Sequence, residues 1–287
     1  MTGRWAGLAL LFAASPALAA VPIGIAQSGH ATVPVSGSFG EVVFVFDTGA
    51  EGSAVYADFA DTLALATTGA ETLQGQTGTA DVALVRIDRL ALDGVEKANI
   101  EAVRLDPRAD GVPLAGIVGL DLFGDRTVDF DFPRRRLALL APGAVPQGPL
   151  GRPVAATPTA GGLLTVPVRI GSVEAVAVID TGARKTRINW NLGRKLGIDP
   201  ASLAKGDSIQ GATNTRIETG ATRVRNVWMG GRRLSDAPVL VADLPVFEAF
   251  GVAGKPAIIL GLDWLEATRM VIDFPGRKVW IAAEGRP

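Results

Sequence analysis

The tetrapeptide Asp-Thr-Gly-Ala occurs twice in this chain, at residues 47–50 and 180–183, and each copy directly follows an apolar run typical of a β-strand. The repeat extends beyond the tetrapeptide, because Thr-Val-Pro-Val at 32–35 recurs at 165–168, at the same distance before the second copy. A repeat of this length is too long for a solenoid unit. We therefore predict two copies of one small domain fused in a single chain.

Three shorter motifs recur in the same order in both halves. They are Leu-Gln-Gly and Ile-Gln-Gly at 73–75 and 209–211, Ile-Val-Gly-Leu-Asp and Ile-Leu-Gly-Leu-Asp at 117–121 and 259–263, and Asp-Phe-Pro at 131–133 and 273–275. Strand-like runs bounded by Gly, Pro or Asp dominate the remaining sequence, and helical patterns are confined to short segments. The pattern predicts strands at 41–46, 82–87, 137–140, 164–170, 175–179, 222–228 and 279–282, and helices at 54–65, 120–124, 189–196 and 262–267. This indicates an all-β protein with short helices in each half.

The domain boundaries follow from composition. Residues 1–19 are typical of a signal peptide, with a basic residue, an apolar stretch and a final Ala-Leu-Ala. We predict an N-terminal lobe at 20–145, a Pro- and Gly-rich linker at 146–162 and a C-terminal lobe at 163–287. The mature protein is therefore expected to be secreted, into the periplasm of a Gram-negative source, without a stable membrane span. Retention of the segment as an anchor is the alternative.

Composition excludes several functions. The chain has no cysteine and one histidine, so thiol catalysis, Cys/His metal sites and disulfides are not expected. We interpret His30 as a solvated residue near the mature N-terminus. A net charge of −1 gives no electrostatic signal for nucleic acid. We predict no metal, no cofactor and no nucleic-acid partner.

Asp47 and Asp180 are the candidate catalytic residues, because the repeat can bring their carboxyl groups face to face. Two carboxyl groups that share one site do not both ionise easily, so one keeps a proton. The ionised group can then activate water while the protonated group polarises a carbonyl. The flanking residues are expected to fix the geometry of both loops. They are Thr48, Gly49, Ala50, Thr181, Gly182 and Ala183.

These motifs resemble the retropepsin-like aspartic proteases over nearly all of the predicted mature chain, twice. The resemblance implies two β-barrel lobes related by a pseudo-two-fold axis, with the active site between them and a flap hairpin in each lobe. The flap residues would be Gln74, Gly75, Gln76, Gln210, Gly211 and Ala212. Such flaps would hold an extended polypeptide substrate in β fashion. Because Ala follows each Asp-Thr-Gly, we expect an optimum at roughly pH 4–7.

Other acidic and basic residues have two interpretations. Glu51 and Arg184 occupy the same repeat position with opposite charge, and we predict that they line subsites, with an inter-lobe ion pair as the alternative. We expect Asp121 and Asp263 to cap short helices. For the aspartates of the last strands we expect contact with solvent. These are Asp129, Asp131 and Asp273.

Two further functions stay open at this point. One is a non-catalytic module that binds extended peptides, and the other is a narrow processing protease that acts on one envelope protein. The sequence does not separate broad from narrow specificity. Because the duplication supplies both halves of the site, we expect a monomer.

Overall fold

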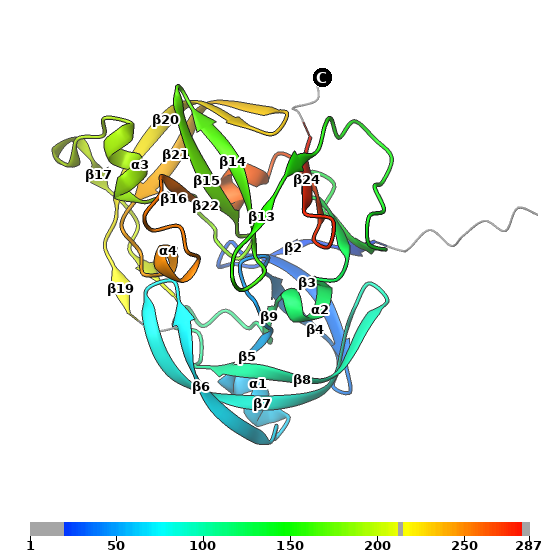
Figure 1. Cartoon of the computed structure of the whole chain (residues 1–287). Coiled ribbons are helices and arrows are strands. Elements are labelled where there is room, and N and C mark those ends of the chain that lie inside the picture. The colour runs from blue at the N-terminus through cyan, green and yellow to red at the C-terminus, as the bar shows by residue number, and fades with distance from the viewer. Residues whose placement is uncertain (1–19, 212–214, 283–287) are drawn as a thin grey trace, which may run out of the picture.

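The computed structural model describes residues 20–211 and 215–282, and strands are its main regular structure (Figure 1). The prediction of an all-β protein with two similar lobes is confirmed. The predicted signal peptide, residues 1–19, lies outside the described residues. No helix among the described residues is both long and apolar enough to cross a membrane.

The described part of the N-terminal half contains eleven strands and two helices. Its strands are β1 (Val21–Pro22), β2 (Gly24–Ile25), β3 (Ala31–Gly37), β4 (Gly40–Phe46), β5 (Ala54–Tyr56), β6 (Thr67–Gly75), β7 (Gly78–Leu92), β8 (Val95–Leu105), β9 (Gly116–Val118), β10 (Thr127–Asp131) and β11 (Arg136–Leu140). Its helices are α1 (Ala57–Thr62) and α2 (Leu120–Phe123).

The rest of the described chain follows a similar order of elements, with additional short ones. Its strands are β12 (Val154–Ala155), β13 (Thr157–Pro158), β14 (Leu164–Ile170), β15 (Val173–Ile179), β16 (Arg187–Ile188), β17 (Ala204–Lys205), β18 (Ile209–Gln210), β19 (Arg216–Ile217), β20 (Gly220–Met229), β21 (Arg232–Val241), β22 (Ala257–Leu260), β23 (Arg269–Asp273) and β24 (Lys278–Ile281). Its helices are α3 (Trp190–Lys195), α4 (Val246–Ala249), α5 (Leu262–Leu265) and the 3-10 helix η1 (Pro200–Ser202).

Each lobe is built on an eight-stranded sheet, and the two sheets have the same strand order. The order is β2-β3-β4-β9-β5-β8-β7-β6 in one lobe and β13-β14-β15-β22-β16-β21-β20-β17 in the other. Both sheets also contain an additional antiparallel pairing, between β3 and β7 and between β14 and β20. The sequence repeat therefore corresponds to a repeat of topology, which relates the two lobes by a pseudo-two-fold axis.

A third, six-stranded sheet joins the lobes, in the order β1-β11-β10-β23-β24-β12. At its centre β10 of one half pairs antiparallel with β23 of the other, with Thr127 opposite Asp273 and Asp131 opposite Arg269. The predicted linker contributes β12 to this sheet and β13 to the C-terminal lobe. The lobes are thus joined by backbone hydrogen bonds as well as by the chain itself.

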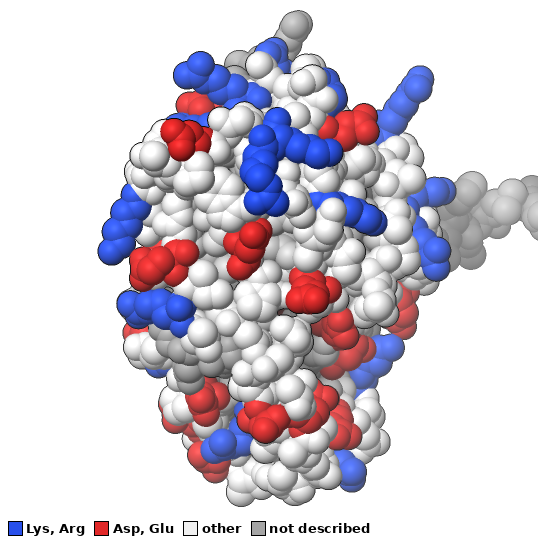
Figure 2. All heavy atoms as spheres, turned by 60° about the vertical axis from the view of Figure 1, so that its left-hand side comes forward, with Lys and Arg blue, Asp and Glu red and all other residues white. Residues whose placement is uncertain are grey.

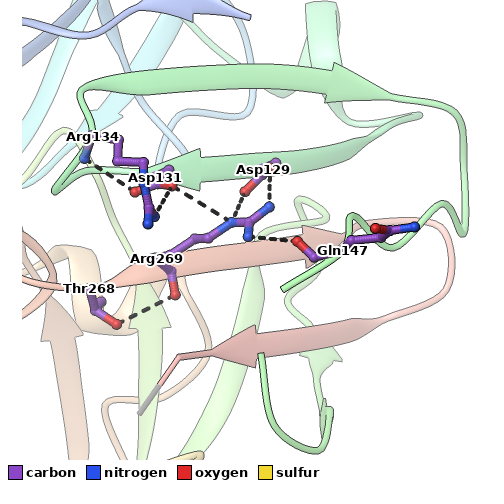
Figure 3. A network of polar contacts seen from close by, with 6 residues as sticks. All are labelled: Asp129, Asp131, Arg134, Gln147, Thr268 and Arg269. Carbon is purple, nitrogen blue, oxygen red and sulfur yellow. Dashed lines mark hydrogen bonds and ion pairs between the residues drawn. The ribbon is translucent and has the colours of Figure 1, made fainter. Parts of the chain in front are cut away.

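The aspartates of the joining sheet are not solvent-facing, contrary to the prediction. Asp131 and Asp273 are buried, and each accepts a hydrogen bond from a backbone amide of the following turn, that of Arg134 or Gly276. Asp129 accepts two hydrogen bonds from Arg269 of the other half, at 2.8 and 2.7 Å (Figure 3). Alternation along a strand does not reveal that a second lobe covers its polar face.

Aromatic side chains fill the space beneath the point where the lobes meet. Phe46, directly before the first Asp-Thr-Gly, stacks on Phe123 with ring centroids 4.5 Å apart. Phe123 in turn lies 5.8 Å from Phe274 of the other half. Because the residue before the catalytic loop is packed in this core, the loop itself has a rigid base.

Two details of the predicted elements differ. Residues 54–56 form β5 and the helix begins at Ala57, because Ala54 and Val55 pair with β9 and β8. The short helix α4 was not predicted.

On the face shown in Figure 2, acidic and basic side chains are interspersed with uncharged ones.

Candidate active site

Both Asp-Thr-Gly loops have the same construction, in which a strand from later in the chain passes through the loop. Strand β9 pairs parallel with β4, which precedes Asp47, and antiparallel with β5, which follows the loop. The amide of Asp47 donates to the carbonyl of Val118, and the amide of Leu120 donates to that of Ala50. In the other lobe, Asp180 and Leu262 donate in the same way to Leu260 and Ala183.

The glycine of each apolar-apolar-Gly segment is required by close backbone contact. A Cβ at Gly119 would lie 2.5 Å from the carbonyl oxygen of Gly52, and one at Gly261 would lie 2.7 Å from the carbonyl carbon of Lys185. These approaches are shorter than any side chain tolerates. The repeat thus preserves glycine where the later strand passes behind each catalytic loop.

The two threonines of the motif connect the loops across the pseudo-two-fold axis. The amide of Thr48 donates to Oγ1 of Thr181 at 3.0 Å, and the amide of Thr181 donates to Oγ1 of Thr48 at 3.1 Å. Each hydroxyl then donates to a carbonyl of the opposite strand, that of Ile179 or Phe46, at 2.9 and 2.8 Å. Since both threonines are buried, these four hydrogen bonds fix the position of one loop against the other.

The carboxyl groups of Asp47 and Asp180 meet at this junction. A Cβ at Gly49 would lie 2.6 Å from Cγ of Asp180, and one at Gly182 would lie 2.2 Å from Oδ2 of Asp47. Oδ1 of Asp47 accepts from the amide of Gly49 at 2.7 Å, and Oδ1 of Asp180 accepts from the amide of Ala183 at 2.8 Å. Each carboxyl group thus lies over the glycine of the opposite loop, where a side chain has no room.

The environment makes the two carboxyl groups unequal. Burial raises the pKa of Asp47 well above its ordinary value, and the charge of Asp180 and a hydrogen bond with its carboxyl group raise that pKa further. Burial also raises the pKa of Asp180, but the nearby charge of Arg187, the amide of Ala183 and the hydrogen bond from Asp47 oppose the rise. These neighbours favour ionisation of Asp180 over that of Asp47.

The hairpin formed by β6 and β7 reaches over this pair of carboxyl groups. Gln74 and Gly75 end β6, and Gln76 lies in the turn before β7. Nε2 of Gln76 lies 3.5 Å from Oδ2 of Asp180, and its Oε1 accepts a hydrogen bond from Nη1 of Arg187 at 2.8 Å. Of the residues predicted for the first flap, Gln76 thus contacts the candidate catalytic pair.

The second predicted flap lies in a separate two-stranded sheet of the C-terminal lobe. Gln210 ends β18, which pairs with β19, and the amide of Gly211 donates to Oγ1 of Thr77 at 3.3 Å. A Cβ at Gly211 would lie 3.3 Å from Cβ of Gln76. Gly211 therefore contacts the turn of the first hairpin. Ala212, the last predicted flap residue, lies outside the described residues.

Glu51 and Arg184 are placed at equivalent inter-lobe positions. Both are exposed and each contacts a glycine turn of the opposite lobe, Gly161 for Glu51 and Gly29 for Arg184. The residues directly before them are Ala50 and Ala183, whose carbonyls accept hydrogen bonds from the amides of Leu120 and Leu262. No ion pair joins Glu51 to Arg184 within the described ranges 20–211 and 215–282. Their role as subsite residues stays a prediction.

His30 is not a solvated N-terminal residue, and this interpretation was wrong. It is partly buried, and its Nδ1 lies 2.8 Å from Oγ of Ser28. Burial lowers its pKa to about 4, and the charges of Arg108, Arg184 and Arg187 contribute to the decrease. His30 is therefore neutral at neutral pH and lies close enough to three arginines to feel their charge.

Asp121 and Asp263 do not cap their helices, contrary to the prediction. The capping residues are Gly119 and Gly261, neither with a side-chain hydrogen bond. Asp121 instead accepts from the hydroxyl of Ser53 at 2.7 Å, and Asp263 accepts from that of Thr186 at 2.7 Å. Both aspartates therefore support the ends of the catalytic loops.

Sequence reasoning missed Arg187 as a site residue. It lies in β16, seven residues after Asp180, where the first half has Ala54. The signal was an arginine within a short strand beside the motif, at a position that is small and apolar in the other copy. The position-by-position comparison of the two copies that singled out Glu51 and Arg184 would also have singled out Arg187.

Comparison with known proteins agrees with this geometry. The profile of a family described as aspartyl protease matches the chain twice, at residues 31–122 and 166–264. The chain belongs to this family, and the two matches correspond to its two lobes. A search of curated proteins found no match.

Proposed function

We propose that the protein is a secreted aspartic endopeptidase, located in the periplasm if the source is Gram-negative, in which Asp47 and Asp180 hydrolyse peptide bonds by general acid-base catalysis. The observation that carries this proposal is the reciprocal placement of the two carboxyl groups, each over the glycine of the opposite loop. Membership of the aspartyl protease family supports a protease function. The signal-like sequence of residues 1–19 supports secretion.

The unequal carboxyl groups suit two different roles. Ionised Asp180 accepts a proton from water as the water oxygen bonds to the peptide carbonyl carbon, and Asp47 gives its proton to the carbonyl oxygen. In the second step the carbon–nitrogen bond breaks, the proton on Asp180 passes to the leaving nitrogen, and Asp47 regains its proton from the new hydroxyl group. Both residues end in their starting states, so no covalent intermediate is required.

The hairpins account for substrate binding in this proposal. An extended polypeptide that lies between the catalytic pair and the hairpin turns can pair with them as an added strand. Because the Gln76 side chain is directed at Asp180 in the free protein, it must move to admit the substrate. Closure of the hairpins over the bound chain then excludes water.

The test is cleavage of a diverse peptide mixture by residues 20–287 between pH 3 and 8. We expect cleavage by the wild type and a decrease of at least about a thousandfold in kcat/KM for Asp47→Asn and Asp180→Asn. Asp58→Asn, an exposed position in α1, is the matched control and should cleave like the wild type. A transition-state inhibitor of aspartic proteases should block the wild type. Equal cleavage by the wild type and both catalytic variants would contradict the proposal.

A further inference from the structure

Arg187 has an unusual environment for an arginine. Its relative exposure is 8%, and its Nε is buried without a hydrogen-bond partner among the described residues. Its Nη1 donates a hydrogen bond to Oε1 of the Gln76 side chain. A buried guanidinium group carries five donors, and each donor left without an acceptor destabilises the protein. Arg187 is therefore poorly satisfied within its own chain.

The acceptor that Arg187 does have must leave when substrate binds. Gln76 lies in the hairpin turn, and its Nε2 is 3.5 Å from Oδ2 of Asp180. Water and the peptide carbonyl must reach that oxygen for the proposed reaction, so the Gln76 amide group occupies space that the substrate needs. Once it moves, Arg187 loses its acceptor, and the bound substrate is the group in a position to replace it.

The chemistry of the Arg187 guanidinium group favours a negatively charged replacement. Asp180, Arg184 and Asp263 act on it electrostatically, and Arg187 also acts on His30, which is neutral at neutral pH because its pKa is lowered to about 4. The catalytic pair shares one negative charge, and the carboxyl group of Asp263 is already engaged by Thr186. A planar guanidinium group binds a carboxylate through two parallel hydrogen bonds, more strongly than it binds a neutral amide.

The effect is confined to one side of the site. The position equivalent to Arg187 in the N-terminal lobe is Ala54, which has no charge and no donor in its side chain. Because the substrate runs between the two lobes, only the part that contacts β16 meets the guanidinium group. The other part meets alanine at the equivalent point.

We propose that Arg187 selects substrates that carry an aspartate or glutamate side chain at one position beside the cleaved bond. The inference rests on the proposed function for the placement of the substrate, but it concerns binding and does not require cleavage. In the free protein Gln76 satisfies part of Arg187, and in the complex the acidic side chain of the substrate takes its place.

The test is a selection of randomised extended decapeptides on Asp47→Asn protein, which binds without cleaving. We expect enrichment of Asp or Glu at one position, and loss of this enrichment when Arg187→Gln is added in the same background. Arg194→Gln, an exposed change in α3, is the matched control and should keep the enrichment. A selected peptide should bind at least about tenfold more tightly with Glu than with Gln at that position.

The outcomes separate the inference from the proposed function. Absence of any acidic enrichment, or enrichment that survives Arg187→Gln, overturns the inference. Because Arg187→Gln can itself disturb folding, the matched Glu and Gln peptides are also measured on protein that retains Arg187. Equal affinity for the two peptides overturns the inference even if the wild type cleaves both. Glu-selective binding without cleavage by the wild type supports the inference and contradicts the proposed protease.

Discussion

At the scale of single residues, the carboxyl groups of Asp47 and Asp180 have the same local loop but different neighbours. The motif gives both an amide donor and an opposing glycine. Arg187 has its charge near Asp180, and alanine occupies the equivalent place in the other lobe. The charge of Arg187 therefore favours the ionised form of Asp180, and nothing equivalent acts at this position in the other lobe.

The pH dependence of cleavage should show this difference. Activity requires Asp180 ionised and Asp47 protonated, so it should be lost as the pH falls through the pKa of Asp180 and as it rises through that of Asp47. The raised pKa of Asp47 extends activity above the ordinary carboxyl range. Arg187→Gln removes a charge that lowers the pKa of Asp180, so the acidic limb of the kcat/KM profile should move to higher pH. An unchanged acidic limb would argue against the assigned roles.

The same environment should reduce the stability of the folded protein at neutral pH. A carboxyl group whose pKa is raised by folding lowers the free energy of unfolding as pH rises from its unfolded pKa through its folded pKa. Asp47→Asn removes this loss and should increase the free energy of unfolding by about 1–3 kcal/mol at pH 7. At pH 3 the two proteins should have similar stability. Denaturant unfolding at both pH values measures the difference, and a larger gain at pH 3 would reverse the assigned sign.

At the scale of elements, the passage of β9 and β22 through the catalytic loops depends on glycine. In Gly119→Ala the new Cβ would lie 2.5 Å from the carbonyl oxygen of Gly52. We expect this change to decrease the free energy of unfolding by about 3 kcal/mol or more, because backbone atoms on both sides must move. Gly52→Ala is the matched control, since nothing lies within 4 Å of its added Cβ. Thermal unfolding measures both variants, and equal stability would show that the loop absorbs the methyl group.

The sequence predicts elements well where the repeat carries the information. The duplicated motifs identified the two lobes, because a carboxylate after an apolar strand and a glycine before a short helix recur at matching places. Residues covered by the other lobe were not predictable in this way. Asp129, Asp131 and Asp273 alternate with apolar residues as surface positions do, yet they lie in β10 and β23, which pair across the two halves, and Asp131 and Asp273 are buried. Local periodicity contains no information about such contacts.

At the scale of the whole molecule, the ion pair between Asp129 and Arg269 connects the two halves (Figure 3). Both side chains are largely buried, with exposures of 14% and 16%. Arg269→Met leaves Asp129 without its partner and should decrease the free energy of unfolding by roughly 2–4 kcal/mol. The side chains of the ion pair between Arg223 and Asp236 have exposures of 56% and 47%. Arg223→Met should therefore change the free energy of unfolding by less than about 1 kcal/mol. A similar decrease in the free energy of unfolding in both variants would mean that the inter-lobe ion pair contributes no more than an exposed one.

Because both halves of the site are encoded once each in a single chain, they need not change together. In an assembly of two identical chains, an arginine placed in one wall is placed in the other as well. Here Arg187 and Ala54 occupy equivalent points, and each can be altered alone. The two sides of the site can therefore be mutated independently, so variants with a new substrate preference on one side can be sought while the other side is left unchanged.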